Sequence, residues 1–124
     1  MSKKAPASIP QPVEWRSHCP VSCALDVLGD KWTLLIVRDL IIHGSRTYSD
    51  FCESPEKIST NVLAARLKHL SKLRLIERIN PDGANRGNAY QLTKSGRALE
   101  PILQAYVEWA QTYLKEFNDS MKKV

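Results

Sequence analysis

The chain has 124 residues, of which 43% are hydrophobic and 25% are charged, and its formal net charge at pH 7 is +5. This composition is typical of one soluble globular domain with a modest core. No apolar run approaches the roughly 20 residues that a membrane-spanning helix needs, so we expect a cytoplasmic protein with no membrane partner. The excess of cations favours an anionic partner without identifying one.

The chain is predicted to divide into three parts. Residues 1–18 contain prolines among serine, alanine and lysine and lack periodicity, so we expect a flexible N-terminal arm. Residues 19–118 carry the periodic apolar patterns and form the predicted domain. Residues 119–124 form a C-terminal tail.

Two helices are expected at the start of the domain. The first begins at Cys19-Pro20, because proline is favoured at the first helical position, and it ends at Gly29. The second begins near Asp30, whose carboxylate suits an N-cap, and follows an apolar stripe to Gly44.

A helix-turn-helix pattern follows. A short helix over residues 47–52, capped by a threonine or a serine, precedes a longer amphipathic helix over residues 59–74 that begins at Ser59. The longer helix contains four cations and no carboxylate, whereas a solvated helix normally mixes both signs. A basic helix with small residues on its polar face fits the major groove of DNA. The pattern therefore predicts a recognition helix, and a solvated amphipathic helix is the alternative.

The polar side of this helix offers groups that can contact DNA. An asparagine amide pairs bidentately with adenine, so Asn61 is the best candidate for base readout. Lys68 and Lys72 are expected to hold phosphates. Small apolar groups contact thymine methyls, and the candidates are Thr60, Ala64 and Ala65.

Arg66 stands apart from these residues, because its position on the helical wheel lies inside the apolar arc. Its guanidinium can pair with a carboxylate such as Asp50 or Glu77, and contact with DNA is the alternative. We predict a mainly structural role.

A β-hairpin is predicted after the recognition helix. Residues 75–79 and 89–92 have strand character, and a stretch rich in glycine and asparagine separates them. A hairpin in this place is the wing of a winged helix, here residues 80–89. Arg86 near its tip is expected to enter the minor groove or to contact phosphate, and an exposed loop cation is the alternative.

One long helix is predicted from Thr93 to about Phe117. Its apolar residues cover more than half of the circumference, which is more than one small core can bury. The sequence therefore predicts a homodimer that pairs through this helix.

Several blocks of the chain, in this order and spacing, resemble the HxlR-type winged helix-turn-helix transcription regulators of bacteria and archaea. The blocks are Cys19-Pro-Val21, Gly29-Asp-Lys-Trp-Thr-Leu-Leu-Ile36, Arg38-Asp-Leu40, Ser54-Pro55, Ile58 to Leu67, Leu75-Ile-Glu-Arg78, and Tyr90-Gln-Leu-Thr93 with Gly96, Leu99, Pro101, Leu103 and Trp109.

The resemblance implies an α+β, mostly α, winged helix-turn-helix with a two-stranded β-wing and N- and C-terminal dimerisation helices. It implies a repressor or activator that binds an inverted-repeat operator in double-stranded DNA as a homodimer. The implied DNA-facing residues are Ser59, Thr60, Asn61, Ala64, Ala65 and Lys68, with Arg86 in the wing, and Lys72 joins them as a phosphate contact. The implied dimer interface contains Val21, Leu25, Leu99, Ile102, Leu103, Tyr106, Trp109 and Tyr113.

Cys19 is a candidate redox switch. Its place at a helix N-terminus, close to Arg16, favours the reactive thiolate, and the family includes members that sense oxidants or electrophiles with a thiol near this position. The alternative is a small residue packed at the dimer interface. A small-molecule effector bound between the dimer helices is a further hypothesis.

Other functions are weaker alternatives. The cysteines and histidines lack zinc-finger spacing, and no common catalytic or cofactor-binding motif is present, so we expect no metal, no cofactor and no catalytic residue. A small thiol enzyme that uses Cys19 with His18 would lack an orienting third group. A winged helix that binds protein or RNA is the remaining alternative.

Overall fold

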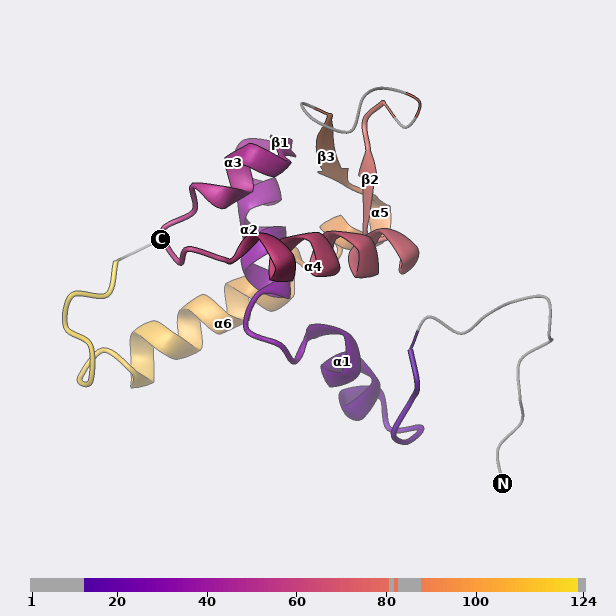
Figure 1. Cartoon of the computed structure of the whole chain (residues 1–124). Helices are drawn as coiled ribbons and strands as arrows, with labels where there is room; N and C mark the ends of the chain where they lie inside the picture. The colour runs from indigo at the N-terminus through magenta and orange to yellow at the C-terminus, as the bar shows by residue number, and fades with distance from the viewer. Residues whose placement is uncertain (1–12, 81, 83–87, 123–124) are drawn as a thin grey trace.

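The computed structural model describes residues 13–80, 82 and 88–122. The elements in chain order are α1 (Pro20–Leu28), α2 (Thr33–His43), β1 (Arg46–Thr47), α3 (Tyr48–Cys52), α4 (Thr60–Lys72), β2 (Ile76–Arg78), β3 (Ala89–Leu92), α5 (Lys94–Arg97) and α6 (Glu100–Tyr113). In Figure 1, α4 crosses in front of α2, the strands β2 and β3 rise above it, and α1 and α6 lie below. Within the described ranges, no helix combines the length and the apolar character that crossing a membrane requires.

The core is built around α2, whose sequence is apolar on almost every side. Val37 and Leu40 of this helix are 0% and 2% exposed. They share one cluster with Phe51 of α3, Leu63 of α4 and Ile76 of β2. A helix that is apolar nearly all round must be covered on several sides, so the other elements are arranged about α2.

The predicted hairpin is present, and it belongs to a three-stranded sheet with the order β1-β3-β2. β2 and β3 are antiparallel, with Ile76 opposite Leu92 and Arg78 opposite Tyr90. The additional strand, β1, pairs with the other edge of β3. The sequence did not predict β1, because a strand of two residues is too short to show alternation.

The C-terminal region corrects the prediction of one helix over residues 93–117. It forms the short helix α5 and the separate helix α6. Pro101 explains the break, since it has no amide to donate to the carbonyl of Arg97 and its ring would clash with that carbonyl. α6 has 14 residues and is therefore about 21 Å long at 1.5 Å per residue, shorter than the predicted helix.

Side-chain caps fix the beginnings of α2 and α3. α2 begins at Thr33 rather than at the predicted Asp30, but the Asp30 carboxylate still accepts hydrogen bonds from the amides of Trp32 and Thr33, both at 2.9 Å. Before α3, Thr47 and Asp50 form a capping box, which confirms the predicted threonine cap.

Candidate nucleic-acid interface

The exposed side of α4 carries the residues that the sequence predicted to face DNA. The Ser59 hydroxyl accepts a hydrogen bond from the Val62 amide at 3.3 Å, which confirms the predicted N-cap. Leu63, Leu67 and Leu70 bury the opposite side of the helix in the core. The residues left exposed are Ser59, Thr60, Asn61, Ala64, Ala65, Lys68 and Lys72. This surface contains two lysines and no carboxylate, so it is suited to a polyanion.

The strand β2, which leads into the wing, contacts this helix. The Asn88 side chain closes the hairpin, because its amide donates to the Asn80 carbonyl and its oxygen accepts from the Asn80 amide. Arg86 falls outside the described residues, so its predicted contact stays a prediction.

Polar contacts attach the turn between α3 and α4 to α2. The buried Asp39 carboxylate accepts a hydrogen bond from the Ser54 hydroxyl at 2.6 Å. Arg38 donates two hydrogen bonds to the Glu56 carboxylate, at 2.8 and 2.9 Å. A further contact joins α3 directly to α4, because the Tyr48 hydroxyl donates to the carbonyl of Thr60 at 3.0 Å. The turn that sets the direction of α4 is therefore held at several points.

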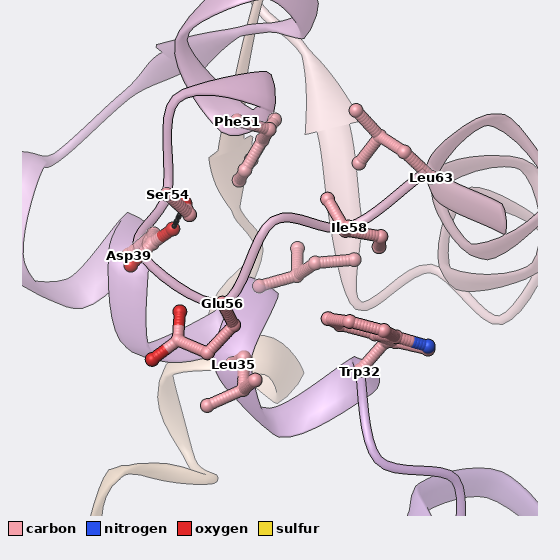
Figure 2. Close-up of a pocket in the computed structure, with 9 residues that line it drawn as sticks. Trp32, Leu35, Asp39, Phe51, Ser54, Glu56, Ile58 and Leu63 are labelled. Atoms are coloured by element: carbon pink, nitrogen blue, oxygen red, sulfur yellow. Dashed lines mark hydrogen bonds between the residues drawn. The ribbon is translucent and has the colours of Figure 1, made fainter. Parts of the chain in front are cut away.

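This junction is tightly packed. Figure 2 shows Asp39, Ser54 and Glu56 on one side of a small pocket and the side chains of Trp32 and Ile58 on the other. The space inside is about 10 Å³, which is the least that one water molecule needs. The pocket is therefore a packing junction between helices rather than a ligand site.

The ion pair between Arg38 and Glu56 keeps its charges at neutral pH. The hydrogen bonds from Arg38 lower the pKa of Glu56, although burial partly opposes this. The same contact with Glu56 raises the pKa of Arg38 further above its ordinary range. Sequence reasoning missed this network, and its only signal was the charged pair Arg38-Asp39 inside an otherwise apolar helix.

Arg66 lies against the start of α2. Its Nη1 is 3.5 Å from Oδ1 of Asp30, so the predicted pairing with a carboxylate is confirmed. The partners named from the sequence, Asp50 and Glu77, are wrong, because Asp50 belongs to the capping box of α3 and Glu77 accepts a hydrogen bond from Gln91 at 3.0 Å. A helical wheel places Arg66 on the correct side of α4 but contains no information on which other element packs there.

Asp30 therefore serves two helices. Burial opposes the ionisation of its carboxylate, but hydrogen bonds from the Thr33 hydroxyl and from the amides of Trp32 and Thr33, with the charge of Arg66, bring its pKa below the ordinary value of 3.8. The ionised carboxylate caps α2 and attracts α4 at the same time.

A second exposed surface is apolar and lies on α6 and α1. Ile102, Tyr106, Trp109 and Tyr113 recur at helical spacing and are between 39% and 62% exposed. The Trp109 and Tyr113 rings contact each other, with centroids 5.9 Å apart.

The remaining predicted interface residues divide into two groups. Val21 and Leu25 of α1 are 67% and 49% exposed. A cleft of about 610 Å³ separates α1, α2 and α6, and Leu25 and Tyr106 both line it. Leu99 and Leu103, in contrast, are half-buried against the core of their own chain.

Cys19 is an exposed free thiol immediately before α1. Its amide donates to the Ser17 hydroxyl at 3.2 Å, and the Cys23 thiol donates to the Ser17 carbonyl at 3.4 Å. Arg16, which the sequence analysis placed near Cys19, forms an ion pair with Asp26 instead. The nearby cation on which the redox hypothesis partly rested is therefore neutralised.

Comparisons with known proteins agree with this geometry. The family model described as HxlR-like helix-turn-helix matches residues 27–118. YdeP, an HTH-type transcriptional regulator of Bacillus subtilis, is 30% identical over 95 residues, which are 77% of this chain and 73% of YdeP. The reduced form of the transcriptional regulator YodB of B. subtilis superposes with a TM-score of 0.64 at 31% identity, covering 78% of this chain and 95% of YodB. The reduced form of the redox regulator HypR gives a TM-score of 0.70 at 27% identity, covering 82% of this chain and 99% of HypR. YodB is also known with quinone bound, and HypR in an oxidised form.

We expect Asp30→Asn to destabilise the protein at neutral pH and to reduce the dependence of its stability on pH. Because the pKa of this carboxylate is lower in the folded chain than its ordinary value of 3.8, its ionised form stabilises the fold above that pH, and the contribution is lost as the pH falls through the folded-state pKa. Asparagine keeps an oxygen that can cap α2 but removes the charge that attracts Arg66.

Urea unfolding followed between pH 7 and about pH 3 measures this effect. The difference in unfolding free energy between the wild type and the variant should be constant near neutrality and shrink below about pH 4. A difference of the same size at the lowest pH would show that the charge of Asp30 contributes nothing.

Proposed function

The chain belongs to the HxlR-like helix-turn-helix family of transcriptional regulators, and from this premise we propose that it binds an inverted-repeat operator as a homodimer. The observation that carries the proposal is the exposed surface of α4, which presents Asn61, two small residues and two lysines without any carboxylate. Regulation of transcription requires access to DNA, so the proposed activity belongs in the cytoplasm.

The proposed contacts divide into base readout and backbone attachment. Asn61 lies in the first turn of α4, where the end of the helix can approach base edges, and its amide matches the donor and acceptor of adenine. Thr60, Ala64 and Ala65 are small enough to let the helix approach thymine methyls closely. Lys68 lies further along the same side and is proposed to hold a phosphate. Ser59, Lys72 and Arg86 complete the proposed interface as backbone contacts.

The exposed apolar surface supports the homodimer. Single exposed apolar residues are ordinary, but α6 presents four large ones on one face, and Val21 and Leu25 of α1 add two more. Because Leu25 and Tyr106 line the same cleft, a second copy can cover both helices at once. Leu99 and Leu103 are proposed to support this interface from behind, since they face the core of their own chain. Two recognition helices held about 34 Å apart would meet successive major grooves.

Control by an oxidant or an electrophile is proposed to act at Cys19. YodB has a quinone-bound form and HypR has reduced and oxidised forms. In this chain Cys19 is exposed and precedes α1, so a modified thiol would lie beside the proposed interface. A thiolate that attacks a peroxide becomes a sulfenic acid and releases water or an alcohol, which places a polar group there.

The alternatives have less support. The relatives are transcriptional regulators rather than enzymes, and the proposal requires no catalytic residue. A winged helix that binds RNA or protein would not need the palindromic preference that the proposed dimer requires.

We expect Asn61→Ala and Lys68→Ala to have different effects on DNA binding. Loss of the amide should reduce discrimination at one base position by about 1–3 kcal/mol, whereas loss of the lysine should weaken every duplex alike and reduce the salt slope by about 1. Selection from a random duplex pool, followed by affinity measurements at several salt concentrations, tests both. Lys115→Ala, on an exposed lysine beyond α6, is the matched control. Equal losses on every sequence for Asn61→Ala would refute the assignment of base readout.

We expect Tyr106→Glu to dissociate the homodimer, because it places a charge in the middle of the apolar face of α6. Sedimentation should show a mass near that of one chain, and affinity for an inverted repeat should fall much more than affinity for a single half-site. Gln104→Glu adds the same charge on the polar side of α6 and should leave the mass unchanged. A wild type that sediments as a single chain would rule out the homodimer.

We expect mild peroxide to modify Cys19 before Cys23 or Cys52, because Cys19 is exposed whereas the other two thiols are half-buried. Operator affinity should change on treatment of the wild type and of Cys52→Ser but not of Cys19→Ser. Mass spectrometry of the treated protein identifies the modified thiol. An unmodified Cys19 with unchanged affinity would remove the redox hypothesis.

A further inference from the structure

A basic groove lies at the C-terminal end of α4, outside the surface described above. It has a volume of about 850 Å³ and is formed by the end of α4, by β2 and by the start of α5. The residues that line it include three cations, Arg74, Arg78 and Lys94, and the hydroxyl of Ser71. We propose that this groove binds a phosphate group.

The lining of the groove contains more cations than carboxylates. Glu77, the only acidic residue of its lining, accepts a hydrogen bond from Gln91 at 3.0 Å. Within the described part of the chain, no carboxylate forms an ion pair with Arg74 or Lys94. Arg74 and Lys94 line the same groove without ion-pair partners among the described residues, and cations in this state attract anions. Arginine and lysine are the side chains that most often recognise phosphate.

The walls of the groove are held in place before any ligand arrives. Arg74 has a φ of 61°, in the left-handed region, and its carbonyl accepts hydrogen bonds from the hydroxyls of Thr93 at 2.6 Å and Ser95 at 2.9 Å. At the same junction, a Cβ atom added to Gly96 would lie 2.1 Å from the carbonyl oxygen of Leu75, so α5 and the start of the hairpin are in direct contact. Binding would therefore cost little rearrangement of the backbone.

The position of the groove fits a DNA phosphate. Ser71 lies between Lys68 and Lys72 in α4, and Arg74 comes just after the end of this helix. Arg78 lies in β2, the strand that leads into the wing. A DNA backbone that runs from the recognition helix toward the wing would pass this groove. The same side chains would also bind the phosphate of a small molecule. Only the assignment of the phosphate to DNA rests on the proposed function.

The test compares Arg74→Gln and Lys94→Gln, singly and together, with Arg97→Gln. Arg97 lies on the same short helix as Lys94 and is exposed but does not line the groove, so it controls for general loss of charge. Thermal melting of each variant establishes that it is folded. If Arg74→Gln fails to fold, the surface variant Lys94→Gln tests the proposal by itself.

Two readouts separate the sources of the phosphate. In the first, affinity for duplex selected from a random pool is measured against salt concentration. If the groove holds the DNA backbone, the slope of log affinity against log salt falls by about 0.9 for each phosphate that the variant no longer neutralises, and the Arg97 control leaves the slope unchanged.

In the second readout, nuclear magnetic resonance follows a titration with pyrophosphate at constant ionic strength. If the groove holds a free phosphate, the amide signals of Ser71 and Ser95 shift in the wild type and in the control but not in the double variant. Unchanged salt slopes together with no saturable pyrophosphate shifts would overturn the proposal. A wild type that binds no DNA at all would instead count against the proposed function, while the pyrophosphate titration still decides the groove.

Discussion

The central constraint of this structure is that one apolar helix, α2, must be covered on nearly every side. Val37 and Leu40 are buried at its centre, and α3, α4 and the sheet all contribute to the same cluster. Because a packed core admits few arrangements, the orientation of α4 follows from how it covers α2. The surface that we propose binds DNA is then the side of α4 that this packing leaves in solvent.

Polar contacts refine what the apolar packing begins. Asp39 is 5% exposed, and burying a carboxylate is costly unless it is paired and hydrogen-bonded. Here Ser54 and Arg38 satisfy it, and Arg46 lies 3.7 Å away. Exposed ion pairs contribute little to the free energy of unfolding. The pair of Arg38 with Glu56 therefore orients the turn before α4 more than it stabilises the fold. It attaches the turn that leads into α4 to a fixed point on α2.

The sequence predicted the elements whose signals are local. Apolar periodicity and the caps at Thr47 and Ser59 located the helix-turn-helix, and the exposed residues of α4 are those on its predicted polar side. The sequence did not predict features that depend on tertiary packing or on very short elements. The strand β1 has too few residues to alternate, and the break before α6 depends on Pro101, whose effect the wide apolar pattern concealed. To predict the partner of Arg66, one must know that the start of α2 packs against α4. No sequence pattern within α4 contains this information.

Ion pairs connect α4 and the turn before it to the cleft between α1, α2 and α6. Asp30 and Arg38 line the cleft between α1, α2 and α6, and their ion-pair partners are Arg66 in α4 and Glu56 in the turn before it. The helix α4 and the turn before it are therefore attached, through these ion pairs, to the cleft beside the apolar faces of α1 and α6. A ligand or a second copy that displaced either side chain would act directly on the orientation of α4. Such coupling requires a contact that differs between two states of the protein, and it does not require a long pathway. Here each connection between the cleft and α4 or its preceding turn is one ion pair.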